Sequence, residues 1–346
     1  MITLLSGAKK NIGDFLIAEK AKQVISHITG EKDFLFIDRW LPFDDRLEEI
    51  NATRAVMVCG GPAYSAEFYP KTLPLVSDLE RIKVPVVPVG LGLAGMHPEA
   101  LGSFSFSKES LKAIRRIHEG CEISGVRDRL TLEKLKEAGI ENVVLSGCPV
   151  MYDLASLGKP FVPPAEVRSI VLTPPAGKHL FGQTVELARR LKERFPKAEM
   201  VASFHRGIRR DTYTSFKHSL HNYYLVHRLE KLGIRCLDTS YDLSRIDFYR
   251  ECDLHVGYRV HAHVNFVSYR KASFLLQEDT RGIGMSGTLG TAANDVCVHD
   301  ADPVGKILAV IERERDNGFA SFSGVPEIID SRFKVMTQVL SPFRQG

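Results

Sequence analysis

The residue types best suited to chemistry gather in one short segment, Gly257-Tyr258-Arg259-Val260-His261. The apolar run before it predicts a buried strand over Leu254–Val256, and the run after it predicts a helix over His261–Tyr269. At such a transition the free amides of a helix N-terminus favour an anion, and arginine adds a bidentate fork for phosphate or carboxylate. His261 can exchange a proton near neutral pH, although it could also simply satisfy a buried backbone group. The segment therefore predicts an anion site that carries an acid/base group.

Other glycines and polar residues also stand where predicted strands end. Ligands of open parallel sheets bind beyond the carboxyl ends of the strands, so these segments predict one shared cleft. Plainer alternatives exist for three of them: a helix cap at Asp14, close backbone approach at Gly60-Gly61, and an ion pair between Arg127 and its neighbour. The segments are Asn11–Asp14, Gly60-Gly61, Arg127-Asp128, His205-Arg206 and Gln277–Arg281.

Short apolar runs alternate with segments of helical period along almost the whole chain. Continuous apolar strands separated by helices are typical of parallel sheets covered on both faces. The predicted strands are Ile2–Ser6, Phe34–Ile37, Ala55–Val58, Val84–Val89, Ile123–Val126, Val143–Leu145, Ser169–Leu172, Glu199–Ser203, Ile234–Leu237, Leu254–Val256 and Ser273–Leu276. The predicted helices are Phe15–Ile28, Ser107–Ile117, Leu130–Ala138, Thr184–Arg194, Asn222–Leu232 and His261–Tyr269.

The alternation is interrupted once, by the proline-rich stretch Gly158–Pro164, and then restarts. We therefore expect an α/β fold of two Rossmann-like, doubly wound parallel-sheet domains that face each other across a cleft, the GT-B-like arrangement. The predicted boundaries are residues 1–157 for the first domain, 158–167 for a linker and 168–300 for the second domain. Residues 301–346 are predicted to form a helical tail with a break near Gly324.

Composition excludes several classes of protein. The chain has 346 residues, 44% of them hydrophobic and 25% charged, which is globular and long enough for two domains. The formal charge of +4 fits an anionic substrate, and its scattered basic pairs do not predict a nucleic-acid track. Six widely spaced cysteines predict reduced thiols, and the N-terminus carries no signal-peptide pattern. With no apolar run long enough to span a bilayer, we expect a cytoplasmic enzyme.

Two alternative chemistries receive little support. His261 and His263, with Asp253 and His255, raise the question of a metal ion, but His-x-His suits a strand and this pair is expected at a helix start. The chain has no HExxH and no CxxC, so we predict no metal. Cys148 could suggest a thiol nucleophile, but nothing near it in the sequence would lower its pKa, which favours a plain buried cysteine.

Several of these motifs together resemble the polysaccharide pyruvyl transferase family over roughly residues 1–285. That family has an opening N-x-G-D, a GG turn after a central strand, an S-x-R-D-x-x-[ST] segment, a TGCP-like turn and an R-[LV]-H-A block followed by a strand and an aspartate. The matching residues here are Asn11, Gly13 and Asp14; Gly60-Gly61; Ser124, Arg127, Asp128 and Thr131; Ser146–Pro149; and Arg259–Ala262 with Ser268 and Asp279. The chain departs from the pattern by an extra Gly125, and by Arg281 where the family often has lysine.

The resemblance implies transfer of the enolpyruvyl skeleton of phosphoenolpyruvate onto two hydroxyls of a saccharide, which gives a pyruvate ketal. Such a site must hold a phosphate and a carboxylate, supply an acid/base and exclude water. The implied partners are phosphoenolpyruvate and a saccharide acceptor that is free, nucleotide-linked or lipid-linked. A lipid-linked acceptor would bring the enzyme to the inner face of the membrane. No metal or nucleotide cofactor is required.

The resemblance also implies roles for individual residues. His261 is the expected general acid/base, Arg259 and Arg127 the clamp on the anionic donor, and backbone amides around Val260 the rest of the phosphate cradle. Asn11 and Asp14 are expected to orient donor or acceptor from the first domain, and Gly60 and Gly61 to match the family's GG turn. His205, Arg206 and Arg281 are further candidates because of their charge and their positions at strand ends.

Three rival interpretations remain at this point. A glycosyltransferase of the same architecture would use a nucleotide-sugar donor, but its usual pair of acidic residues is missing around Arg259–Tyr269. A catalytically silent binding protein with a closing cleft is disfavoured by the missing signal peptide and by the Arg-x-His placement. A family member that has recruited another substrate is compatible with Gly125 and Arg281.

Overall fold

The computed structural model describes residues 1–345 as two α/β domains stacked along the long axis of the molecule. The first domain contains a six-stranded sheet in the order β2-β1-β3-β4-β5-β6, with every neighbouring pair parallel. In this order β2 and β3 lie on opposite sides of β1, so the topological switch point lies between β1 and β3. The strands are β1 (Ile2–Ser6), β2 (Phe34–Asp38), β3 (Val56–Tyr64), β4 (Val86–Leu93), β5 (Ser124–Val126) and β6 (Val143–Leu145).

The second domain contains another six-stranded parallel sheet, in the order β12-β11-β10-β7-β8-β9. Counted from β7, this is the Rossmann order 3-2-1-4-5-6, with its switch point between β7 and β10. The strands are β7 (Ser169–Thr173), β8 (Glu199–Phe204), β9 (Arg235–Asp238), β10 (Leu254–Gly257), β11 (Ala272–Gln277) and β12 (Val296–Cys297). The predicted fold class, two Rossmann-like domains, is confirmed.

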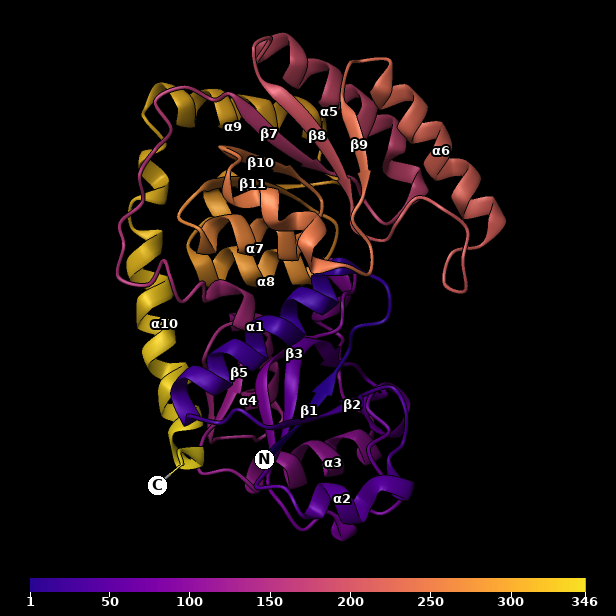
Figure 1. Ribbon diagram of the computed structural model, residues 1–346, viewed down its shortest axis with the longest axis vertical. Coiled ribbons are helices and arrows are strands. Elements are labelled where there is room, and N and C mark those ends of the chain that lie inside the picture. Colours follow the sequence, from indigo (N-terminus) through magenta and orange to yellow (C-terminus); the bar gives the residue numbers. More distant parts are fainter. Residues whose placement is uncertain (346) are drawn as a thin grey trace.

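The helices cover the faces of both sheets (Figure 1). Six of them lie close to the predicted segments, and the tail is helical with a break at Gly324, as expected. The helices are α1 (Ile12–Thr29), α2 (Leu47–Asn51), α3 (Lys108–Glu119), α4 (Arg129–Glu137), α5 (Phe181–Arg194), α6 (Phe216–Glu230), α7 (Val260–Ser268), α8 (Thr280–Leu289), α9 (Pro303–Asp316) and α10 (Val325–Leu340).

Helix α8 was not predicted, because its three glycines argue against a helix in the sequence. The structure gives a reason for one of them. A Cβ atom added to Gly284 would lie 2.9 Å from the Cγ atom of Asp128, which caps α4 in the other domain. The amide of Arg129 also donates to the hydroxyl of Thr288 at 3.1 Å. Glycine therefore lets α8 approach the start of α4 across the domain interface.

Strands β3 and β4 run past the glycine segments at which they were predicted to end. Gly60, Gly61 and Gly90 have positive φ angles, a conformation that normally breaks a strand. The two strands nevertheless remain paired, with Gly61 opposite Leu91 and Pro62 opposite Gly92, and the register shifts only beyond Pro62. Because both strands bend at matching positions, the ladder between them continues.

The chain between the two sheets and the chain after β12 connect the domains. Residues 158–167, the predicted linker, contain no helix or strand. Helix α9 packs on β11, β12 and α5 of the second domain, whereas α10 (yellow in Figure 1) runs down to α1, β5 and β6 of the first. The amide of Gln345 donates to the carbonyl of Thr29 at 2.9 Å. The predicted tail therefore packs against both domains.

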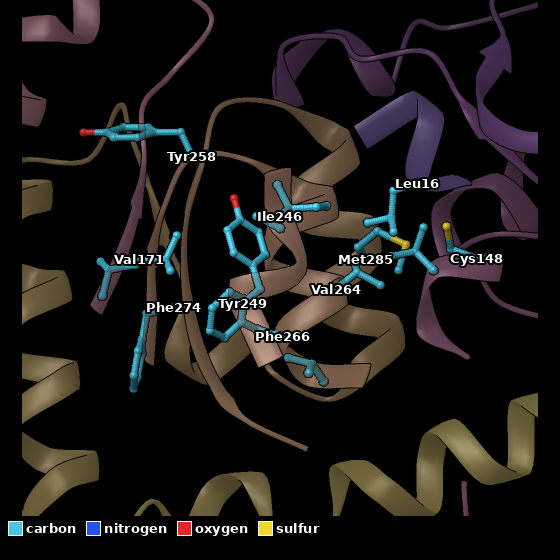
Figure 2. Close-up of a cluster of buried hydrophobic side chains, with 14 of the residues drawn as sticks. Leu16, Cys148, Val171, Ile246, Tyr249, Tyr258, Val264, Phe266, Phe274 and Met285 are labelled. Carbon is cyan, nitrogen blue, oxygen red and sulfur yellow. The ribbon is translucent and has the colours of Figure 1, made fainter. Parts of the chain in front are cut away.

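An apolar core continues across the domain interface. Leu16 of α1 and Cys148 of the first domain lie against Val264 of α7 and Met285 of α8, as Figure 2 shows. All four side chains are at most 5% exposed. Burial of such side chains stabilises by roughly 1.5–3 kcal/mol each. This contact fixes α1 and α7 relative to each other one turn beyond their N-terminal ends.

Among residues 1–345, no helix is both long enough and apolar enough to cross a membrane.

The bend in β4 yields a prediction about stability. Gly90 has a φ of +69°, and an added Cβ would lie 2.6 Å from the carbonyl oxygen of Gly147. We expect Gly90→Ala to lower the free energy of unfolding by roughly 2–4 kcal/mol, through backbone strain and overpacking. Gly182→Ala in α5 is the matched control, because nothing lies within 4 Å of its added Cβ. Urea unfolding should show the control unchanged or stabilised by up to about 1 kcal/mol; equal stability of the two variants would contradict this account.

Candidate active site between the two domains

The N-terminal ends of α1 and α7 meet between the domains. Each helix follows a strand at the switch point of its own sheet, β1 and β10 respectively. Their first residues are in close contact, since a Cβ atom added to Gly13 would lie 3.1 Å from the Nδ1 atom of His261. The N-cap residues, Asn11 and Arg259, make no side-chain capping bond. Two positive helix ends thus converge at one point, which favours an anion there.

A small cavity of about 50 Å³ lies where these helix ends meet. It combines residues of both domains and contains seven of the eleven predicted site residues. Its lining consists of Asn11, Gly13, Arg127, His205, Tyr258, Arg259, Val260, His261, Glu278 and Arg281.

The cavity contains buried polar atoms that have no hydrogen-bond partner. Within residues 1–345, eight side-chain nitrogen or oxygen atoms of seven residues are in this condition. Four of the eight line this one cavity: Asn11 Oδ1, Arg127 Nη1, Arg259 Nε and His261 Nε2. An unsatisfied buried polar group costs roughly 1–3 kcal/mol, so this arrangement is expensive unless a ligand supplies partners. The three nitrogens and the oxygen belong to both domains and converge on the same space.

The arginines of the cavity differ in how many of their hydrogen-bond donors are already paired with other groups of the protein. Arg127 is 1% exposed, donates from Nε to Asp128 at 2.9 Å and keeps Nη1 unpaired. The predicted alternative of an ion pair at Arg127 is therefore present, together with an unused donor. Arg281 forms a bidentate pair with Asp279, the shortest distance being 2.6 Å. Burial lowers the pKa of Arg259 to about 10, which leaves it charged at neutral pH. Of these three arginines, Arg259 is therefore the one whose guanidinium makes no ion pair with a carboxylate among residues 1–345.

His261 is neutral at physiological pH. Burial lowers its pKa from 6.5 to about 3, and the nearby charges of Arg127, Arg281 and Arg39 lower it further in the same direction. A neutral imidazole can accept a proton but has none to spare as an acid. With a pKa of about 3, however, His261 is a weak base until an anionic ligand offsets the charges of the neighbouring arginines.

The pKa values of two carboxyl groups, those of Glu278 and Asp14, are raised. Burial raises the pKa of Glu278, which lines the cavity, although Arg259 and Arg281 oppose the shift. Burial also raises the pKa of Asp14, against its hydrogen bond with Asn11 and the charge of Arg39. Asp14 does not line the cavity itself. Groups whose pKa values are pushed apart in one site are the usual acid and base of an enzyme.

Glu278, Tyr258 and Arg39 were not selected as site residues from the sequence. Glu278 directly follows β11, so its strand-end position and charge could have identified it. Arg39 follows β2 and donates to the carbonyl oxygens of Gly60 at 2.7 Å and Pro62 at 3.1 Å. Tyr258 donates to Gln183 at 2.9 Å. No pattern in the sequence indicated that Arg39 would reach across from β2 to β3.

Gly60 and Gly61 do not line the cavity. A Cβ at Gly60 would lie 2.6 Å from the side chain of Ile17, and one at Gly61 would lie 3.4 Å from Arg39. Close packing on α1 accounts for glycine at position 60, which is the alternative noted from the sequence, and the positive φ of +77° accounts for Gly61. Their contact with a substrate stays a prediction.

His205 and Arg206 occupy different positions. His205 lines the cavity, but its Nε2 is hydrogen-bonded to Tyr249 at 2.8 Å, and burial lowers its pKa well below 6.5. Its carbonyl accepts from the amide of Ile12 at 3.0 Å, a backbone bond between the domains. Arg206 is exposed and lines a neighbouring hollow with Arg259. His205 therefore supports the site, and Arg206 borders it.

The residues considered for metal or thiol chemistry are held by other partners. His255 and His263 both bond Ser273, at 2.7 and 2.9 Å. Within residues 1–345, no three His, Cys, Asp or Glu side chains gather in a way that could hold a metal ion. Burial raises the pKa of Cys148 to about 11, so its thiol stays protonated at neutral pH.

Two Rossmann-like domains with an arginine-rich cavity between them form a GT-B-like architecture. The family model described as polysaccharide pyruvyl transferase matches residues 11–279 of the chain. The chain belongs to this family, and it is a transferase. The resemblance inferred from the sequence is thus confirmed, and the match favours it over a nucleotide-sugar glycosyltransferase. No curated protein matches the chain.

Solved structures share the fold at low sequence identity. The UDP-GlcNAc 2-epimerase from Neisseria meningitidis bound to UDP-GlcNAc has 13% identity and a TM-score of 0.53, covering 98% of this chain and 99% of its own. The UDP-GlcNAc 2-epimerase from Methanocaldococcus jannaschii has 12% identity and a TM-score of 0.53, covering 97% and 99%. S. aureus MnaA with UDP has 12% identity and a TM-score of 0.52, covering 100% and 92%. These likenesses extend over both domains and concern the fold alone.

The lowered pKa of His261 yields a prediction about stability and pH. Because its folded-state pKa of about 3 lies below 6.5, the unfolded chain binds more protons between these values, and stability falls as pH falls from 7. At pH 5 this group should cost roughly 1–2 kcal/mol. We expect His261→Gln to lose less stability than the wild type between pH 7 and 5 in urea unfolding. His27→Gln, at an exposed position on α1, should behave like the wild type; the same behaviour in His261→Gln would refute the shift.

Proposed function

We propose that this enzyme transfers the pyruvyl group of phosphoenolpyruvate onto two hydroxyls of a saccharide, forming a pyruvate ketal in the synthesis of a cell-surface or secreted polysaccharide. The observation that carries the proposal is the set of four unpaired buried polar atoms at the junction of α1 and α7. Three of them are nitrogens of Arg127, Arg259 and His261, beside two helix N-termini. Such a cluster is suited to a small, densely anionic donor that carries both phosphate and carboxylate.

Arg259 and Arg127 are the proposed clamp on the donor. Arg259 lines both the cavity and the adjacent hollow, so its guanidinium can reach the phosphate while Arg127 takes the carboxylate from the other domain. Amides at the start of α7, around Val260, have no partner within the helix and can complete the phosphate cradle. Arg281, which is already paired with Asp279, contributes charge more than a direct fork.

The transfer requires one proton to arrive and two to leave. Protonation of the methylene carbon of the donor converts it to a methyl group and leaves an oxocarbenium-like centre at the adjacent carbon. A saccharide hydroxyl adds to that carbon and loses its proton, and then the carbon–oxygen bond to phosphate breaks. The second hydroxyl adds to the same carbon, loses its proton and closes the ketal. One of the released protons replaces the one consumed, and the other leaves with phosphate.

The shifted pKa values divide these tasks between two residues. His261, neutral with Nε2 unpaired, is the proposed base that takes the proton of the attacking hydroxyl. Glu278, whose pKa is raised, is the proposed acid for the methylene carbon. Asn11 and Asp14 at the start of α1 orient the reactants from the first domain. The reaction requires no metal ion and no nucleotide cofactor.

The acceptor is a saccharide, either free or carried on a nucleotide or a lipid. The six free thiols of the chain fit a reducing compartment, so we place the enzyme in the cytoplasm. A lipid-linked acceptor would bring it to the inner face of the membrane.

Removal of the proposed clamp yields the first functional prediction. We expect Arg259→Ala to weaken phosphoenolpyruvate binding roughly 50-fold or more, because a charge-assisted bidentate contact is lost. Equilibrium dialysis with labelled phosphoenolpyruvate measures this directly. Arg189→Ala is the matched control, since Arg189 is exposed on α5 and pairs only with Glu186 and Glu193. Equal affinities in the two variants would remove Arg259 from the clamp.

The assignment of His261 as base and Glu278 as acid yields the second functional prediction. We expect His261→Gln to lower kcat by roughly 10²–10⁴-fold with little change in donor affinity. Phosphate release in the presence of an acceptor saccharide gives the rate. In deuterated water, mass spectrometry should show one deuterium in the ketal methyl group, and Glu278→Gln should slow that incorporation. A fully active His261→Gln variant, or a product without deuterium, would contradict the scheme.

A further inference from the structure

An unusual concentration of exposed apolar side chains lies on one face of the second domain. Among residues 1–345, ten large apolar or aromatic side chains are exposed, and six of them fall between residues 213 and 241. Monomeric proteins rarely leave such a group in water without a function. We call these six residues and the basic side chains around them the α6 face. Its apolar members are Tyr213, Phe216, Leu220, Tyr223, Tyr224 and Tyr241, which are between 41% and 62% exposed.

Helix α6 is apolar on two opposite sides. Its buried side packs on the domain through Leu225 and Leu229. Its outer side carries Phe216, Leu220 and Tyr223-Tyr224, at positions i, i+4, i+7 and i+8 of one stripe. The outer stripe is exposed and takes no part in the packing of the helix on the domain.

The same segment carries the basic charge of the chain. Residues 206–231 contain six lysines or arginines against two acidic residues, a formal charge of +4. This equals the net charge of the whole chain, so the remaining residues are neutral in sum. One of the two acids, Asp211, is paired with Lys10 at 2.5 Å. The potential at this face is therefore positive.

The loop before α6 is held in place. The Nζ of Lys10 also donates to Thr214 at 2.5 Å, and Tyr241 donates to Asp211 at 2.9 Å. Figure 1 shows this loop and the start of α6 projecting from the second domain beside the junction of the domains. The α6 face is thus formed in advance and exposed at the edge of the protein.

We propose that the α6 face docks the enzyme on an anionic lipid bilayer. Tyrosine and phenylalanine side chains on a helix that lies in the plane of the surface, flanked by lysine and arginine, match the membrane interface in both chemistry and charge. Arg209, Arg210, Lys217 and Arg228 meet the lipid phosphates, and the aromatic stripe enters the headgroup region. This proposal does not depend on the identity of the donor.

The α6 face lies close to the proposed active site. The inner side of α6 contributes His218 and Asn222 to the hollow that also contains Arg206 and Arg259. A bilayer on the outer side therefore lies one helix thickness, about 10 Å, from the hollow that borders the proposed active site. A saccharide carried on a membrane lipid would reach the cavity over this edge.

Vesicle co-sedimentation of the full-length chain tests the docking. We expect binding to phosphatidylcholine vesicles that contain phosphatidylglycerol, weak binding to phosphatidylcholine alone, and a marked loss at high salt. Arg209→Gln with Arg210→Gln should weaken binding roughly 25-fold, about fivefold for each charge removed. Phe216→Ser with Tyr224→Ser should weaken it at least roughly tenfold.

Lys108→Gln with Lys112→Gln is the matched control, which removes the same charge from exposed positions on α3 and should leave vesicle binding unchanged. All substituted positions are exposed, so thermal unfolding should not change, and donor binding should remain intact. Absence of vesicle binding, equal binding to both kinds of vesicle, or equal loss in the control would overturn the proposal. Light scattering that shows a dimer broken by Phe216→Ser with Tyr224→Ser would instead assign the face to self-association.

Discussion

The close contact between the first turns of α1 and α7 is the constraint on which the site depends. A Cβ atom added to Gly13 would lie 3.1 Å from the Nδ1 atom of His261, so any side chain there would push the imidazole away by a few tenths of an ångström. One turn further along the same helices, Leu16 and Val264 pack in a continuous apolar core (Figure 2). The apolar contact thus fixes the position of α1 relative to α7, and this position brings the two positive helix ends to one cavity. Burial energy from the core compensates for gathering several arginines in a poorly hydrated space.

The same crowding determines the chemistry available there. Buried among Arg127, Arg281 and Arg39, His261 is neutral at physiological pH, whereas burial keeps a proton on the carboxyl of Glu278 to higher pH than usual. A site rich in fixed positive charge lowers the pKa of a histidine. The same charge attracts an anionic ligand, which would offset the positive charge and raise that pKa again. The unpaired Nε of Arg259 is consistent with this, because it costs energy until an anionic ligand provides an acceptor.

Much of this organisation can be predicted from the sequence, because each step depends on local patterns. Apolar runs and helical periods locate the strands, and the strand-end rule brings Asn11, Arg127 and Arg259 to one cleft. What cannot be predicted depends on contacts between distant segments. Helix α8 contains three glycines that argue against a helix, and one of them, Gly284, is explained by the approach of the helix to Asp128 in the other domain. The continuation of β3 through Gly60 likewise depends on a matching bend in β4.

The central claim, that the cavity between α1 and α7 holds an anionic phosphoenolpyruvate donor, is tested most directly by calorimetry. The purified protein would be titrated with phosphoenolpyruvate and, separately, with UDP and GDP. We predict saturable binding of phosphoenolpyruvate and no binding of either nucleotide. Binding of a nucleoside diphosphate without binding of phosphoenolpyruvate would contradict it, and would indicate a nucleotide-sugar donor in the same cleft.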